Sequence, residues 1–359
     1  MSDATDIRVM LVDTAERVFA DHCTQHIVEG AKNNGWSQAL WQVLERTQLT
    51  LVSVLEERGG AGGSLSDLGA VLRVAGRFSA PVPLAETAIL AGWMLAGSGL
   101  DVPAGPIAAG PSGRDETPSL RRDGANWTLS GQFQRAPWAR IAAYVAVLAE
   151  YEGRTYVARV DRSRCAVKPG FNLAWEPRDD LHFGAVSLRA DDVAPAGPGV
   201  TRRALYERGA LARAVLMAGA LDRALELSIE HARNRVQFGR AISKFQAIQQ
   251  ELARFADEVA AAAAAAMSAV GAVERGEHGI AVACAKLRVA EAANTGAGIA
   301  HQIHAAIGVT EEYALHHSTL RLQAWRAEFG SEVEWGEWLG EKILSAGADS
   351  LWPTLTDTA

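Results

Sequence analysis

The chain has 359 residues, with 35 lysines and arginines against 42 aspartates and glutamates, so its formal net charge is −7. This acidic balance excludes a globally basic nucleic-acid-binding protein. An apolar fraction of 48% with 21% charged residues excludes a largely disordered chain. A chain of this length usually divides into two or three subdomains.

Cysteine usage and the N-terminus indicate the compartment. Cys23, Cys165 and Cys284 are too few and too scattered for a disulfide framework or a zinc knuckle. The first residues are acidic and lack the apolar core of a signal peptide. No run of about 18 apolar residues predicts a membrane span. We therefore predict a cytoplasmic protein without a membrane span.

Residues 1–100 are predicted to be helical. Apolar side chains recur every three or four positions in two segments that begin near Leu11 and Trp36. Polar residues at 64–67 can cap a helix over residues 68–76. A further helix is predicted over residues 84–100.

Residues 101–201 are predicted to form a small β domain, because prolines and glycines are frequent and apolar residues come in short runs. Asp179 and Asp180 are expected in a solvated turn before a strand that begins at Leu181. The predicted strands include residues 127–129, 143–148, 155–160 and 186–188.

Residues 202–359 return to helical periodicity, with a last helical segment over residues 312–345 that is broken at Gly330. Long helices with short links are typical of an antiparallel bundle. The predicted fold class is α+β, mostly α. It comprises an N-terminal helical domain (1–100), a middle β domain (101–201) and a C-terminal four-helix bundle (202–359).

Two local patterns bear on ligands. Arg235, Phe238 and Arg240 place two guanidinium groups beside an aromatic ring, which suits a phosphate and a stacked ring. A solvated helix terminus explains the same residues equally well. His301 and His304 lie three positions apart, but no carboxylate–histidine motif completes a zinc site, so we predict no metal.

Larger sequence blocks carry a resemblance to a known family. Residues 230–249 contain Arg235-x-x-Phe238-Gly239, six further residues and Gln246. Residues 302–313 are similar to a Gln-x-x-Gly-Gly-x-Gly block that ends in Glu-Tyr, and residues 56–62 and 127–131 give weaker support. In this order the blocks resemble the acyl-CoA dehydrogenase superfamily over nearly the whole chain.

The resemblance implies FAD-linked oxidation of the Cα–Cβ bond of an acyl-CoA, in fatty acid or steroid degradation, with an electron-transferring flavoprotein as a possible acceptor. A carboxylate takes the α-proton and the flavin takes hydride. It also implies that Arg235 contacts the FAD pyrophosphate, that Phe238 packs near it, and that Gln246 and Gln302 line the adenine side. In the family these groups serve largely the FAD of a neighbouring subunit.

The chain departs from the family at the positions closest to the chemistry. Ala305 and Ala306 stand where the family has a glycine pair that approaches the dinucleotide. Pro137 stands where a Thr or Ser supports the flavin ring, and it has no N–H to donate. Phe329 stands at the position of the late catalytic glutamate. Glu328 is adjacent, but on a helix a shift of one residue turns it by roughly 100°.

Some family members carry the base at the start of the first bundle helix, a position near Gly209 in this chain. Glu207, two residues earlier, is our candidate catalytic residue. An exposed glutamate that favours the helix dipole is the alternative. Arg202, Arg203, Arg208 and Arg213 lie in the same region; they suit CoA phosphates or a solvated helix start.

The retained residues serve a neighbour's FAD, and the missing ones belong to the subunit's own flavin ring and base. We therefore expect one half of a hetero-oligomeric acyl-CoA dehydrogenase, with a homologous subunit as partner, although self-association stays open. The alternative is a non-redox paralogue that acts as a binding or scaffolding subunit. A flavin monooxygenase or nitroalkane oxidase on the same fold also needs a held ring, and Pro137 argues against both.

Overall fold

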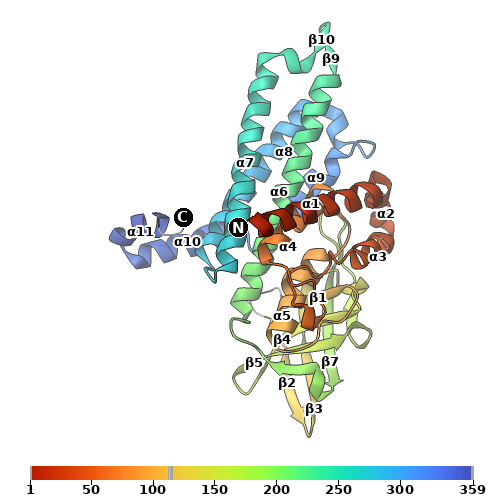
Figure 1. The fold of residues 1–359 in the computed structure, drawn as a ribbon, viewed down its shortest axis with the longest axis vertical. Helices are drawn as coiled ribbons and strands as arrows, with labels where there is room; N and C mark the ends of the chain where they lie inside the picture. Colours follow the sequence, from red (N-terminus) through yellow and green to blue (C-terminus); the bar gives the residue numbers. More distant parts are fainter. Residues whose placement is uncertain (1, 112, 114–115, 357–359) are drawn as a thin grey trace. The chain divides into compact units, whose positions relative to one another are not determined.

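The structure is a computed structural model that describes residues 2–111, 113 and 116–356. The chain forms two compact units, the first from residues 1–71 and 80–209 and the second from residues 72–79 and those from 210 onward. Helices, then a sheet, then helices follow one another along the chain (Figure 1). This order confirms the predicted α+β class, whereas the three domain boundaries stay a prediction.

Two of the N-terminal helices, α3 and α4, begin where the sequence supplies side-chain caps. The Ser37 hydroxyl accepts a hydrogen bond from the Leu40 N–H. Ser64 and Asp67 cap α4 reciprocally, each side chain accepting from the other's backbone N–H at 3.0 Å. The helical segments are α1 (Ser2–His22), α2 (Gln25–Asn34), α3 (Gln38–Arg46), a 3₁₀ turn (Glu56–Arg58), α4 (Leu65–Arg77), a π-helical segment (Glu86–Gly92) and α5 (Trp93–Gly97).

The sheet of the first unit runs in the order β6-β7-β3-β2-β4-β5-β8, with β1 paired to β4 in parallel. Its core contains Leu129, Phe133, Val147 and Phe183, all almost fully buried. The predicted strands are present, and additional strands complete the sheet. The strands are β1 (Ile107–Gly110), β2 (Ser119–Asp123), β3 (Asn126–Pro137), β4 (Tyr144–Tyr151), β5 (Arg154–Asp161), β6 (Ala166–Lys168), β7 (Arg178–Leu188) and β8 (Val193–Pro195).

The expectation of a turn at Asp179 and Asp180 is wrong, because both residues lie inside β7. Asp180 is partly exposed, whereas the Asp179 side chain is 0% exposed. Its carboxylate accepts from the Arg140 backbone N–H at 2.7 Å and from the Arg140 Nε at 2.8 Å. The Gly170 N–H also donates to it, at 3.2 Å. Burying a carboxylate requires such donors. Asp179 therefore ties β7 to two preceding loops.

The second unit is helical and alanine-rich. Helix α7 packs against α8 through small buried residues, among them Ala262 and Ala266. By length and composition α7 is apolar enough to cross a membrane, a test that core helices of soluble proteins also pass. The elements are α6 (Arg202–Asn234), β9 (Val236–Gln237), β10 (Arg240–Ala241), α7 (Gln246–Glu274), α8 (Ile280–His304), a 3₁₀ turn (Ala305–Val309), α9 (Leu315–Arg326), α10 (Glu332–Ala346) and α11 (Leu351–Thr356).

Glycines allow the end of α4 to cross α6 closely within the second unit. A Cβ at Gly76 would overlap the Leu216 carbonyl, and one at Gly219 would overlap the Arg73 carbonyl. Beside this crossing, the Arg73 guanidinium donates two bonds to Asp222, at 2.8 and 2.9 Å. A bidentate pair fixes orientation as well as distance.

We predict that Asp179→Ala lowers the free energy of unfolding by about 3–5 kcal/mol, because it leaves the Arg140 guanidinium and two backbone donors without their buried acceptor. Asp180→Ala is the matched control. Asp180 is 38% exposed and pairs with Lys168 at 3.4 Å, so its loss costs about 1 kcal/mol or less. Urea denaturation followed by circular dichroism measures both values. Equal losses would contradict the account.

Candidate functional site

A short hairpin lies between the C-terminus of α6 and the N-terminus of α7, and the predicted pyrophosphate-binding residues lie in and beside it (Figure 1). Phe238 and Gly239 form its turn with φ angles of 51° and 76°. Positive φ at both central residues gives a tight hairpin turn, and glycine adopts it without strain, but a bulky residue does so at a cost. Phe238 is 92% exposed. A strained aromatic side chain held in solvent indicates a functional constraint rather than packing.

Polar groups predicted for the same ligand flank the tip. Arg235 is exposed, and its guanidinium has no ion pair among the described residues. Arg240 instead lies over the Phe245 ring, 4.2 Å from its centroid. Gln246 is exposed and begins α7. Arg235 therefore keeps its donors available for an anion, while Arg240 serves the hairpin itself.

The second predicted segment lies at the end of α8, where Gln302, Ala305 and Ala306 are all exposed. Ala305 has φ 53° and ψ −142°. This combination favours glycine and costs an L-residue of order 1–3 kcal/mol. The backbone thus keeps a glycine-type conformation at the position where the family has glycine, although the residue is alanine.

Buried aromatic contacts hold this segment in place. The His304 Nδ1 bonds to the Ala300 carbonyl at 2.8 Å, and its Nε2 bonds to the Tyr313 hydroxyl at 3.2 Å. The His231 ring stacks on His304 with a centroid distance of 4.5 Å. Burial lowers the pKa of His304. These neutral rings fix the end of α8 against α6. Among the described residues no group of three or more His, Cys, Asp or Glu is arranged to hold a metal.

The loop between α9 and α10 contains no free carboxylate at the family's base position. Phe329 occupies it with φ 53°, outside either helix, so the expected helical geometry for Glu328 is wrong. The Glu328 carboxylate accepts from the Arg213 Nε at 2.6 Å, with side-chain exposures of 10% and 2%. A buried carboxylate paired with a guanidinium is stabilised in its charged form and is a poor proton acceptor.

Lys286 holds the same loop through three hydrogen bonds. Its Nζ donates to the carbonyls of Trp325, Arg326 and Glu328, at 2.7, 3.0 and 2.9 Å. Burial lowers the pKa of Lys286 to about 7. The three acceptors use all three hydrogens of the ammonium and close the C-terminus of α9. The Trp335 indole N–H donates to the Phe329 carbonyl at 2.9 Å, which holds the loop from the other side.

Glu207, the candidate base within this chain, is buried rather than exposed on the helix start. Its carboxylate accepts from the Arg203 Nε at 2.6 Å. A catalytic role for Glu207 stays the alternative to a base supplied by another subunit.

The strand expected to hold a flavin ring does not fit that group. Pro137 ends β3 without an N–H, as its residue type dictates. The Arg135 N–H is already used, donating to the Asp180 carboxylate at 3.1 Å. The Trp138 N–H donates to the Pro177 carbonyl at 3.0 Å. The N–H groups of Arg135 and Trp138 are therefore already used, and Pro137 has none to offer a flavin.

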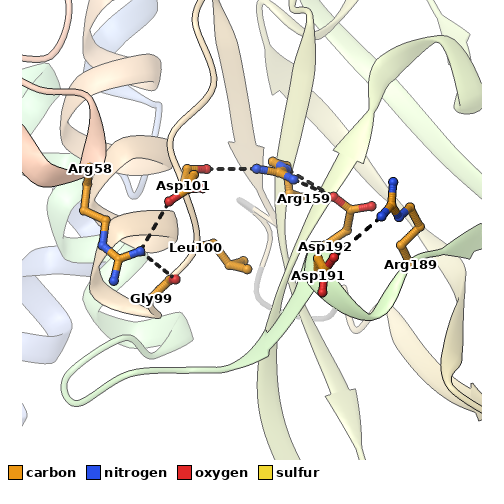
Figure 2. A pocket seen from close by; sticks show the side chains of 8 residues that line it. All are labelled: Arg58, Gly99, Leu100, Asp101, Arg159, Arg189, Asp191 and Asp192. Atoms are coloured by element: carbon orange, nitrogen blue, oxygen red, sulfur yellow. Dashed lines mark hydrogen bonds and ion pairs between the residues drawn. The ribbon is translucent and has the colours of Figure 1, made fainter.

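Figure 2 shows a polar pocket of about 440 Å³ in the first unit, lined by three arginines and three aspartates. Arg58 donates to the Gly99 carbonyl at 3.0 Å and pairs with Asp101 at 3.3 Å. Arg159 pairs with Asp192 at 2.7 Å. The three arginines and three aspartates balance in charge, and the arginines bind acceptors within the pocket. Arg159, on β5, also donates to the Asp101 carbonyl, so these side chains link β5 to the Gly99–Asp101 turn.

We predict that Ala305→Gly raises the free energy of unfolding by about 0.5–2 kcal/mol, since glycine relieves the strain at φ 53° and loses only part of this gain to chain entropy. Ala306→Gly is the control: residue 306 is not among the residues with positive φ, so the change costs roughly 0.5–1 kcal/mol. Thermal and urea unfolding check both signs. A destabilised Ala305→Gly variant would refute the strained geometry.

The chain is similar in sequence and in fold to known proteins. The chain is 29% identical over 320 residues to the acyl-CoA dehydrogenase IpdE2 of Mycobacterium tuberculosis, covering 86% of this chain and 88% of that protein. A chain of the ChsE4–ChsE5 complex from M. tuberculosis superposes with a TM-score of 0.85 at 22% identity, over 97% of this chain and 99% of that chain.

A glutaryl-CoA dehydrogenase of Mycobacterium smegmatis, solved in complex with FADH2, superposes with a TM-score of 0.85 at 16% identity, over 97% of this chain and 96% of that chain. The family thus includes proteins that bind the predicted cofactor. Family models match residues 5–101 as the N-terminal domain and residues 197–334 as the C-terminal domain of acyl-CoA dehydrogenases. The chain therefore belongs to the acyl-CoA dehydrogenase family.

Proposed function

We propose that this chain is a subunit of a hetero-oligomeric, FAD-linked acyl-CoA dehydrogenase that acts on the Cα–Cβ bond of an acyl-CoA thioester. A homologous subunit supplies the flavin-ring seat and the catalytic base. This chain completes the adenine and pyrophosphate side of that shared site. The observation that carries the proposal is the exposed Arg235, which has no ion pair within the described part of the chain, next to the exposed Phe238 at the hairpin turn.

Two features of the hairpin suit this task. An exposed guanidinium without an internal acceptor can bind a phosphate with two parallel N–H bonds. An exposed phenylalanine gives a flat apolar surface next to it. Gln302 and Gln246 add amide donors and acceptors for a purine edge. When bound, FAD supplies the hydride acceptor for the reaction.

The chain's own ring seat and base position argue against a complete site in this subunit. Pro137 offers no donor, and Phe329 has no ionisable group. Glu328 is committed to Arg213 at 2.6 Å. No catalytic step is therefore assigned to a flavin held by this chain alone. The structural neighbour in the ChsE4–ChsE5 complex supports an assembly with a second, different chain.

A non-redox paralogue that acts as a binding or scaffolding subunit is the second candidate. The lost ring seat favours it, whereas the unpaired Arg235 does not, because a scaffold has no need of a vacant phosphate-binding group. An electron-transferring flavoprotein as acceptor and a cytoplasmic location remain predictions for this chain.

We predict that Arg235→Ala, in the complex co-expressed with the homologous subunit, weakens FAD retention roughly tenfold or more, because a charge-assisted pyrophosphate contact is lost. Flavin absorbance per protein after gel filtration measures the retention. Arg233→Ala is the control, since Arg233 is also exposed at the end of α6. Unchanged flavin content in Arg235→Ala would reject the shared site.

We predict that Glu207→Gln in the same complex keeps the turnover number within about threefold of the parent, because the base belongs to the partner subunit. A general base contributes typically 10²–10⁴-fold. Acyl-CoA oxidation with an artificial electron acceptor measures the rate, and flavin content confirms assembly. A loss of about 100-fold or more would instead assign the base to Glu207 and give this chain its own active site.

A further inference from the structure

Four arginines lie near the start of α6, at positions 202, 203, 208 and 213, and three of them have oxygen acceptors. These acceptors are the Gly113 carbonyl for Arg202 (2.7 Å), Glu207 for Arg203 (2.6 Å) and Glu328 for Arg213 (2.6 Å). The sequence alone treats all four alike. In the structure three of them are used in holding the protein together.

Arg208 is the exception. Within the described ranges its guanidinium makes no hydrogen bond and no ion pair, and its buried Nε has no acceptor. Its guanidinium carbon lies 4.3 Å from the centroid of the Trp93 ring. Both residues belong to the first unit.

Such an arrangement is costly for a folded protein. A guanidinium stays protonated and presents five donors. Arg208 is half-buried, and its Nε donor is buried without an acceptor, so this donor forfeits its hydration. Burial lowers the pKa of Arg208 to about 10. The cation–π interaction with the indole face of Trp93 offsets part of this lost hydration free energy. It does not satisfy the planar N–H fork, which matches a carboxylate.

The surroundings hold Trp93 firmly and leave the charge unbalanced. Trp93 follows directly on the fully buried π-helical segment Glu86–Gly92, a geometry that occurs frequently at functional sites. The Thr87 hydroxyl accepts from the Ile107 N–H at 3.0 Å and ties this segment to β1. The carboxylate next to Arg208 in sequence, Glu207, is engaged by Arg203 at 2.6 Å.

We propose that Arg208, braced on Trp93, is a binding site for an organic carboxylate. This site goes beyond the shared FAD site and does not depend on it, since neither residue belongs to the dinucleotide-binding set. Two sources offer the same chemistry: a free carboxylic acid, or an acyl-CoA whose acyl group ends in a carboxylate. Both bind through two parallel N–H bonds to the carboxylate oxygens.

Calorimetric titration of the full-length chain with three probes tests the site: sodium glutarate, glutaryl-CoA and butyryl-CoA. The site requires either measurable glutarate binding, which identifies a free acid, or glutaryl-CoA binding at least tenfold tighter than butyryl-CoA, which identifies an acyl carboxylate. In Arg208→Gln the glutarate binding or the glutaryl-CoA preference disappears. Arg189→Gln is the control for general charge attraction, because Arg189 is 81% exposed. This variant is expected to leave both binding signals unchanged.

A stability measurement covers the case in which Arg208→Gln fails to fold. Arg208→Met removes an uncompensated charge and keeps the apolar packing on Trp93, so the melting temperature rises by roughly 2 °C or more. A merely structural stacking role lowers it instead. The proposal is overturned if Arg208→Met melts lower than the parent, or if neither probe signal depends on Arg208. Flavin content plays no part in these readouts, so the shared FAD site stands or falls separately.

Discussion

The functional account depends on one locked loop, residues 327–331, where a family member would present its base. Arg213 binds the Glu328 carboxylate at 2.6 Å, and Lys286 donates to two carbonyls at the end of α9 and to the Glu328 carbonyl in the loop. Breaking a buried pair of this kind typically costs about 3–5 kcal/mol. The loop is thus held in a form that presents Phe329 at the position where the family resemblance implies the base.

This loop and the exposed hairpin differ in what they offer a bound FAD. The groups that suit a dinucleotide's phosphates and adenine are exposed, and Arg235 is unpaired among the described residues. The groups that would hold a flavin ring or take a proton are replaced, or already engaged, as at Pro137 and Glu328. Strain points the same way, since Phe238 and Ala305 both keep positive φ angles without being glycine. Selection for packing alone does not explain such positions.

The sequence predicted much of the fold, because its long helices repeat apolar residues at three and four positions and its caps are polar side chains of ordinary type. It missed the π-helical segment Glu86–Gly92, since every residue there is buried and no period remains. It misplaced Asp179 because the partner Arg140 lies 39 residues away. The candidate site residues were predicted from the spacing of sequence motifs. That Arg208 has no hydrogen-bond acceptor among the described residues could not be predicted in this way, because it depends on the tertiary contacts of the neighbouring arginines.

The most direct test of the account is the absorbance spectrum of the purified chain, alone and after co-expression with a homologous subunit. The shared-site account predicts a colourless chain that shows flavin bands only in the co-expressed complex, because the ring seat belongs to the partner. Flavin bands in the chain alone would contradict it, since Arg135–Pro137 would then hold a ring. A colourless complex would contradict it as well and favour the non-redox paralogue.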